Sequence, residues 1–272
     1  MDPSSYSFVM AVTDGLVDVG LGRIADALVG AAIVLVSVFV VPRQLWRLHG
    51  AQRSSPPRIV VSYRKPEETS AYPLPVTGKG QLDAVGALAP SLVRAYGWRW
   101  RQPLTIVPGA EGTEPRDLGG NLILLGGPMR NEATRMLFAR CGERLGVRQE
   151  PYDEEVYGDR LLIRDDDGGW QTFGGTPRAR DGTRGKVTED YGLVVRMPNP
   201  WDDDRRKQCL VFSGVHTYGT GAAAAYFVKQ WRKPAWWARH GVLALVRVEV
   251  DSDHVVEIEE LLFRRLGDRR RR

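Results

Sequence analysis

The sequence predicts an α/β fold: a mixed sheet with peripheral antiparallel strands, preceded by one N-terminal transmembrane helix. Residues 121–145 (NLILLGGPMRNEATRMLFARCGERL) and 209–230 (CLVFSGVHTYGTGAAAAYFVKQ) each hold a short apolar run, a glycine turn and a helical stretch. Further apolar runs alternate with helical stretches, which is typical of α/β domains. A long apolar segment near the N-terminus is typical of a membrane span.

The composition is that of a globular protein with a substantial core. Of the 272 residues, 43% are hydrophobic and 26% are charged. The formal net charge is +5, and the four arginines of residues 269–272 supply most of it. A body so close to neutral does not indicate a nucleic-acid-binding surface. The two cysteines, Cys141 and Cys209, lie in a predicted helix and a predicted strand, and we expect both to be small buried hydrophobic residues.

The segment from Ile24 to Val41 (IADALVGAAIVLVSVFVV) is predicted to cross a lipid bilayer. As a helix its eighteen residues span about 27 Å, close to the thickness of a bilayer's hydrocarbon core. Asp26 is its one charged residue, and Trp46 lies where interfacial aromatic residues are common. The alternative is a buried core helix, which rarely lacks a polar face over such a length. A cleaved signal peptide is disfavoured because acidic residues precede the segment in place of basic ones.

Basic residues predict the orientation of this span. Arg23 is the only one before it, whereas six follow it closely: Arg43, Arg47, Arg53, Arg58, Arg64 and Lys65. The positive-inside rule therefore predicts a single-pass protein of the cell membrane, with residues 1–23 outside and the C-terminal domain in the cytoplasm. Residues 42–57 are predicted to be a juxtamembrane linker, residues 58–267 an α/β domain that folds without the anchor, and residues 268–272 a basic tail.

The first half of this domain is predicted to contain three strands and two helices. Residues 58–63, 104–107 and 121–125 are short apolar runs typical of strands. Residues 81–96 form an amphipathic helix that Pro90 kinks or divides. The apolar side of this helix is predicted to consist of Leu82, Val85, Leu88, Leu92 and Val93. A second helix is expected over residues 132–145.

The second half is predicted to be richer in antiparallel pairs. Residues 161–164 and 169–173 flank a turn-rich stretch and predict a hairpin. Residues 191–197 return through a turn to residues 209–212, most simply as an antiparallel pair. Residues 222–230 form a helix with Thr220 as its N-cap. Residues 242–250 and 254–262 predict a final hairpin.

The two glycine turns are the candidate binding site. If both follow neighbouring parallel strands, the helix N-termini after them converge at one edge of the sheet and attract an anion. The candidate ligand-binding residues are Gly126, Gly127, Asn131, Gly214, His216, Thr217, Tyr218, Gly219 and Thr220. The alternative is that the glycines only allow close packing of helix on sheet, and both interpretations stay open. If a ligand binds there, Gly214→Val should block it with modest loss of stability.

The turn lacks the features of better-known catalytic loops. Gly214 and Gly219 have the spacing of a phosphate-binding loop, but no Lys-Ser/Thr pair follows Gly219, so a nucleoside triphosphatase is disfavoured. No G-x-S-x-G elbow surrounds Ser213. The four histidines are scattered, so no metal site is predicted, and no cofactor is identified.

His216 is the candidate catalytic residue, acting as acid or base. In the antiparallel arrangement, Glu189, Asp190 and Tyr191 lie at the same end as Gly214, and Asn199 lies at the other end. A histidine–carboxylate pair is therefore geometrically allowed, although a surface turn is the favoured place for each carboxylate. Asn131 either caps the helix that follows it or presents its amide to a ligand, and capping is favoured.

The combination of NLILLGGPMRN, YGLVVRMPNPW and GVHTYGTGAAA resembles a group of uncharacterised prokaryotic Rossmann-like domains. Members of this group share a GGP turn with a following asparagine and a strand that leads to a G-x-H-x-Y-G-T turn. The resemblance covers residues 58–266 and implies a Rossmann-like mixed sheet. It implies no particular activity.

Three functions follow as hypotheses. The first is a membrane-anchored sensor or signalling domain that binds a nucleotide or another anionic metabolite. The second is an enzyme that hydrolyses a nucleotide or cleaves its glycosyl bond with His216. The third is a membrane-tethered scaffold that docks a protein partner. The lipid bilayer is the one partner common to all three.

Overall fold

A computed structural model describes residues 41–49, 55–62, 78–96, 106–108, 113–151, 156–157, 159–174, 178–179, 187–230, 232–238 and 240–267. The chain divides into two compact units, Met1–Arg43 and Gln44–Arg272. Among the described helices, none is both long and apolar enough to span a membrane. The predicted span lies outside the described residues except for Val41, so it stays a prediction.

The larger unit is a mixed α/β domain built on a seven-stranded sheet with the order β12-β11-β9-β10-β3-β1-β2. Strands β10, β3, β1 and β2 are parallel neighbours, and β9, β11 and β12 add three antiparallel pairings at one side. The predicted α/β class, the β9–β10 pair and the final hairpin are thereby confirmed. The strands are β1 Arg58–Val61, β2 Ile106–Pro108, β3 Leu122–Leu125, β9 Glu189–Pro198, β10 Gln208–Gly214, β11 Val242–Asp251 and β12 His254–Arg265.

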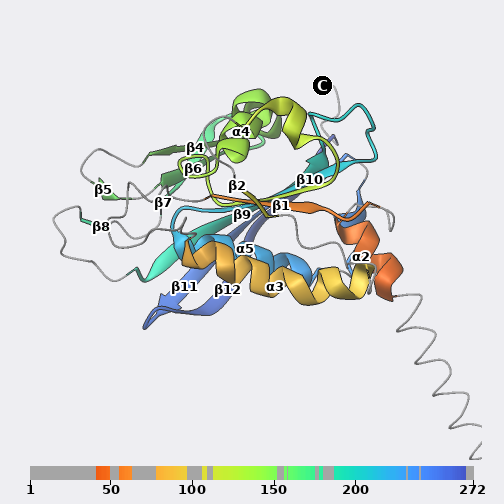
Figure 1. The fold of residues 1–272 in the computed structure, drawn as a ribbon. Coiled ribbons are helices and arrows are strands. Elements are labelled where there is room, and N and C mark those ends of the chain that lie inside the picture. Colours follow the sequence, from red (N-terminus) through yellow and green to blue (C-terminus); the bar gives the residue numbers. More distant parts are fainter. Residues whose placement is uncertain are drawn as a thin grey trace, which may run out of the picture. The chain divides into compact units, whose positions relative to one another are not determined.

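Helices cover both faces of this sheet. Figure 1 shows α3 (Lys79–Tyr96) and α5 (Thr217–Val228) side by side on one face, and α4 (Glu132–Leu145) on the other. Two short 3₁₀ turns, η4 (Pro115–Leu118) and η5 (Pro234–Trp237), lie in the connections. The two strands at the centre, β3 and β10, are buried along their whole length, as their apolar sequences predict.

A smaller antiparallel sheet follows α4. It consists of β4 (Val147–Pro151), β6 (Asp159–Arg164) and β7 (Trp170–Gly174) in the order β4-β6-β7, and it includes the predicted hairpin. The short strands β5 (Val156–Tyr157) and β8 (Arg178–Ala179) form a separate pair. The ring of Phe173 on β7 lies 5.6 Å from that of Tyr191 on β9, so the small sheet packs beside one end of the large one.

Helix α2 (Val41–His49) falls in the stretch that the sequence analysis assigns to a linker. Leu48 and His49 are fully buried, and the Trp46 indole nitrogen donates a hydrogen bond to the carbonyl oxygen of Ala95 in α3. His49 Nε2 lies 3.1 Å from Ser91 Oγ, and its ring packs on Phe227 of α5. The compact unit accordingly begins at Gln44 and not at the expected Arg58.

Helix α3 turns a different side to the core than its composition suggests. Leu88 and Leu92 are fully buried as predicted, whereas Leu82 and Val93 are exposed. The reason is the contact with α5: a Cβ on Gly80 would lie 1.8 Å from the backbone oxygen of Thr217. This close approach turns the ridge of Gly80, Ala84, Leu88 and Leu92 inward, at four-residue spacing.

Cys141 and Cys209 are both buried and unpaired with each other, which confirms their interpretation as small hydrophobic core residues. Burial raises the pKa of both thiols above the ordinary range, so neither is suited to act as a nucleophile at neutral pH.

Candidate functional site

The two glycine turns lie at the same edge of the sheet. Leu125 at the end of β3 is in register with Phe212 near the end of the parallel strand β10. The backbone nitrogen of Gly126 donates a hydrogen bond of 2.8 Å to the carbonyl oxygen of Phe212. The predicted adjacency of the turns is therefore confirmed, and it places both at the carboxyl ends of the parallel strands.

The N-terminus of α5 already binds an anion, and that anion is Asp190 of β9. Its Oδ1 accepts hydrogen bonds from the backbone nitrogens of Tyr191 at 2.7 Å and His216 at 2.9 Å. Its Oδ2 accepts a hydrogen bond of 2.6 Å from the backbone nitrogen of Gly219. The sequence predicts that such donors hold an external anion and that Asp190 lies in a surface turn. The structure instead buries Asp190 completely against them.

Two opposing effects act on the pKa of Asp190. Desolvation raises the pKa of Asp190 above its ordinary value, while the neighbouring His216 and the three backbone donors act in the opposite direction. His216 itself is half-buried at this edge. The carboxylate thus lies behind the histidine and fixes its backbone position.

Helix α5 begins earlier than predicted. Its first residue is Thr217 and its N-cap position is His216, so Thr220 lies inside the first turns and does not cap the helix. The carboxylate of Asp190 performs the capping that a Thr220 side chain was expected to provide. Because this cap comes from another strand, the local sequence around Thr220 could not reveal it.

Gly214 and Gly219 serve close packing. A Cβ on Gly214 would lie 2.4 Å from the backbone nitrogen of Thr220, and one on Gly219 would lie 2.1 Å from the carbonyl oxygen of Tyr191. Backbone atoms cannot move aside without shifting the helix. This geometry predicts a larger loss of stability for Gly214→Val than the sequence does, and it supports the packing interpretation of these glycines.

Two further candidate residues contact neighbouring elements. Thr217 Oγ1 accepts a hydrogen bond of 3.2 Å from the backbone nitrogen of Gly80 at the start of α3. The hydroxyl of Tyr218 donates to Asp253 Oδ1 at 2.5 Å, in the turn between β11 and β12. Both side chains therefore bind α5 to its surroundings.

Asn131 caps helix α4, as the favoured interpretation predicts. Its Oδ1 accepts from the backbone nitrogen of Thr134 at 3.3 Å, and its amide donates to the carbonyl oxygens of Leu125 and Val60. The side chain is fully buried and ties the ends of β3 and β1 together. Before it, Gly126 has a φ of +97°, which explains the glycine in the first position of the turn.

Three polar side chains at this edge were not among the sequence candidates: Ser62, Gln81 and Gln149. The amide of Gln81 donates to the Ser62 hydroxyl, and a Cβ on Gly126 would lie 2.8 Å from the same amide. Ser213 Oγ donates to Gln149 Oε1 at 2.6 Å, and Gln149 Nε2 donates to the carbonyl oxygen of Gly214. Gln81 and Gln149 reach the edge from α3 and β4, so only the tertiary fold reveals them.

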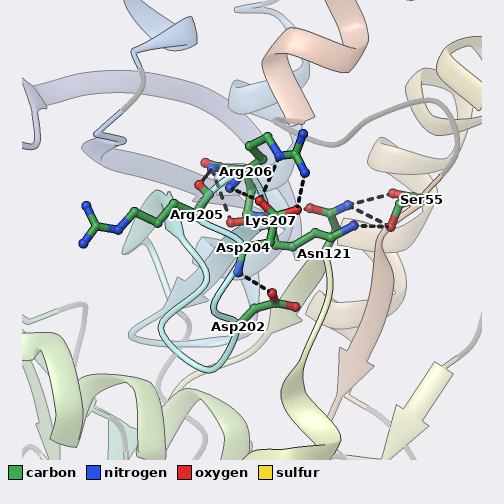
Figure 2. Close-up of polar contacts among 8 residues, drawn as sticks. Ser55, Asn121, Asp202, Asp204, Arg205, Arg206 and Lys207 are labelled. Atoms are coloured by element: carbon green, nitrogen blue, oxygen red, sulfur yellow. Dashed lines mark hydrogen bonds and ion pairs between the residues drawn. The ribbon is translucent and has the colours of Figure 1, made fainter.

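The opposite edge is closed by interactions within the chain. Figure 2 shows the amide of Asn121 donating to the carbonyl oxygen and the hydroxyl of Ser55. The ammonium group of Lys207 donates to the same hydroxyl. Asn199 lies at this far edge, as predicted, and donates to the carbonyl oxygens of Leu118 and Gly120. These contacts hold the β9–β10 turn against the starts of the parallel strands.

Within the described parts of the chain, His, Cys, Asp and Glu side chains form no group able to hold a metal ion. The chain matches no protein-family model, no curated protein and no solved structure. The candidate site is therefore defined by its own geometry: the carboxyl ends of β1, β3 and β10, with His216, Ser62, Gln81, Gln149 and Ser213 around them.

Proposed function

We propose that this chain is a membrane-anchored, Rossmann-like sensor or signalling protein whose cytoplasmic domain binds a nucleotide or another anionic metabolite. The ligand binds at the carboxyl ends of β1, β3 and β10. The single observation that carries the proposal is the register of Leu125 with Phe212, which brings both glycine turns to one edge.

The connectivity of the sheet supports this location. The helices that follow β1 and β3 cover opposite faces, so the strand order reverses between these two neighbours. Open α/β sheets bind ligands outside the carboxyl ends of the strands at such a reversal. Ser62, Gln81 and Gly126 lie at this point, and the β10 turn with His216 lies one strand away.

The recognition differs from that of a phosphate-binding loop. Asp190 occupies the N–H groups of His216 and Gly219, so the dipole of α5 is already compensated. The polar edge of the ligand is met by side chains: the imidazole of His216 and the hydroxyl and amide groups of Ser62, Gln81 and Gln149. A ligand recognised in this way is selected by its base or sugar as well as by its charge.

A second candidate function is an enzyme that cleaves a nucleotide with His216 as general acid or base. The observation that favours it is the buried carboxylate of Asp190, which accepts a hydrogen bond from the backbone nitrogen of His216 and so fixes this residue at the edge of the sheet, where its imidazole is available for proton transfer. In this case the bound nucleotide is consumed over time. In the sensor it is released unchanged.

The test is a thermal-shift screen of the full-length chain in detergent against nucleotides, dinucleotides and nucleosides, with inorganic phosphate as the matched anion. A ligand that binds only the folded state raises the unfolding midpoint. We expect one nucleotide class to raise it, His216→Ala to reduce the shift, and Val256→Ala, at an exposed residue of β12, to leave it unchanged. No shift with any compound, or the same shift with phosphate alone, contradicts the proposal. Chromatography of the ligand afterwards separates the sensor from the enzyme.

A further inference from the structure

Helix α2 follows the predicted membrane span without a spacer. The span ends at Val41, where α2 begins, and the buried part of α2 starts at Leu45, which is 4% exposed. Four residues of helix rise only about 6 Å. A domain that begins so few residues after the end of a span is tethered within reach of the lipid headgroups.

The outer face of α3 is the surface suited to that position. Leu82 is 58% exposed and Val93 is 52% exposed, although both are large and apolar. The residues between them on the same face, at helical spacing, are uncharged: Gly86, Ala89 and Pro90. From Ala84 to Val93 the helix carries no charged side chain at all. An exposed apolar strip of this kind indicates a contact that the isolated domain does not make.

Basic residues accompany this strip. Arg94 follows Val93 on α3, and Arg43 and Arg47 lie on the exposed side of α2, whose opposite side packs beside the last turns of α3. Basic residues immediately cytoplasmic of a span bind the anionic headgroups of the inner leaflet. The combination of an apolar strip with a basic flank is that of a helix lying in the membrane interface.

We infer that the outer face of α3 rests on the bilayer surface, with Leu82 and Val93 inserted among the headgroups and Arg43, Arg47 and Arg94 bound to anionic lipid. The inference rests on the membrane anchor of the proposed function. It adds to that function an orientation: α3 and α5 face the membrane, and α4 on the other face of the sheet points into the cytoplasm.

The experiment uses the full chain in nanodiscs of phosphatidylcholine and phosphatidylserine. Leu82→Cys, Val93→Cys and Met129→Cys are each labelled with the polarity-sensitive fluorophore NBD. All three positions are exposed, so the substitutions spare the core, and the native thiols of Cys141 and Cys209 are buried. Met129 is the matched control, since it is apolar and 56% exposed but precedes α4. Lipids that carry nitroxide groups along their acyl chains then quench any label within the bilayer.

We expect labels at positions 82 and 93 to lose most of their fluorescence and the label at position 129 to keep it. Nanodisc capture of the chain is measured first and reports on the anchor alone. A captured chain whose α3 labels are not quenched overturns the inference and leaves the anchor intact. Crosslinking of two copies through position 93, without quenching, assigns the strip to a second copy and also overturns it. A chain that is not captured by nanodiscs overturns both the anchor and the inference.

Discussion

Oδ2 of Asp190 lies 2.6 Å from the backbone nitrogen of Gly219, and this hydrogen bond ties β9 to the first turn of α5. The same carboxylate binds the backbone nitrogens of His216 and Tyr191. One buried side chain therefore sets the shape of the turn that carries the candidate catalytic residue. The helix N-terminus, which attracts anions in many α/β proteins, is compensated from within the fold.

Asp190→Asn tests this role. The amide keeps the size of the side chain but points a donor at backbone N–H groups, which leaves a buried polar group unsatisfied and costs about 1–3 kcal/mol of unfolding free energy. Urea unfolding measures the loss. Asp165→Asn is the control, because Asp165 also accepts a backbone hydrogen bond, from Gly169, but at an exposed turn. Equal small losses in the two variants would show that Asp190 does not organise the turn.

Gly214→Ala tests the packing role of the glycine turn. The new Cβ would lie 2.4 Å from the backbone nitrogen of Thr220, so the start of α5 has to shift, at a cost of about 1–3 kcal/mol. Gly86→Ala is the matched control on α3, where nothing lies within 4 Å and the helix gains about 0.4–1 kcal/mol. The two variants should therefore move the unfolding midpoint in opposite directions. A neutral Gly214→Ala would instead leave the turn open for a ligand-binding role.

A pair of N-terminal truncations tests the integration of α2. A chain that begins at Val41 keeps Leu45 and Leu48, which are buried, whereas a chain that begins at Arg58 loses both. Each buried leucine stabilises the fold by about 1.5–3 kcal/mol, a large share of a typical total of about 5–15 kcal/mol. We expect the longer chain to give a cooperative unfolding transition and the shorter one to be strongly destabilised or aggregated. Identical unfolding transitions of the two chains would show that residues 42–57 are a linker, as the sequence predicts.

His49 should make stability depend on pH. Burial lowers its pKa from 6.5 to about 3, and the positive charge of Arg196 acts in the same direction. Below pH 6.5 the unfolded chain binds a proton that the folded chain refuses. The unfolding free energy therefore falls as the pH falls from 6.5 toward 3, by about 1.4 kcal/mol per pH unit. Ser91 of α3 and Phe227 of α5 contact the ring, and Arg196 of β9 is the charged group that acts on it.

The measurement is denaturant unfolding between pH 7 and pH 4. Acidic side chains contribute to the slope of any protein, so the informative quantity is the difference between the wild type and His49→Gln, which does not titrate. The variant should show the shallower slope. Parallel slopes would mean that His49 is solvated in the folded chain.

Patterns within single segments predicted most of the fold. The asparagine after the GGP turn identified the cap of α4, and the turn-rich stretch before Gln208 identified the β9–β10 pair. The partner of the β10 turn was missed because Asp190 reaches it from another strand. The docking of α2 was missed because its polar and basic composition resembles a linker, and its three buried residues carry little signal on their own.

The candidate site was predictable only in its location. Glycine turns after apolar strands predicted that the two turns share one edge of the sheet, since parallel neighbours align their carboxyl ends. The side chains that line it could not be chosen from the sequence. Gln81 and Gln149 depend on how α3 and β4 pack, and Thr217 and Tyr218 are used by contacts with α3 and the β11–β12 turn.

The most direct test of the ligand site is photoaffinity labelling of the full chain in detergent with an azido-adenine nucleotide, followed by mass spectrometry of the labelled peptides. Excess unlabelled nucleotide identifies the specific label. We predict that the competed label maps to residues 126–131 or 213–220, and that His216→Ala reduces it. A competed label elsewhere, such as residues 199–207 at the far edge, or no competed label at all, would contradict it.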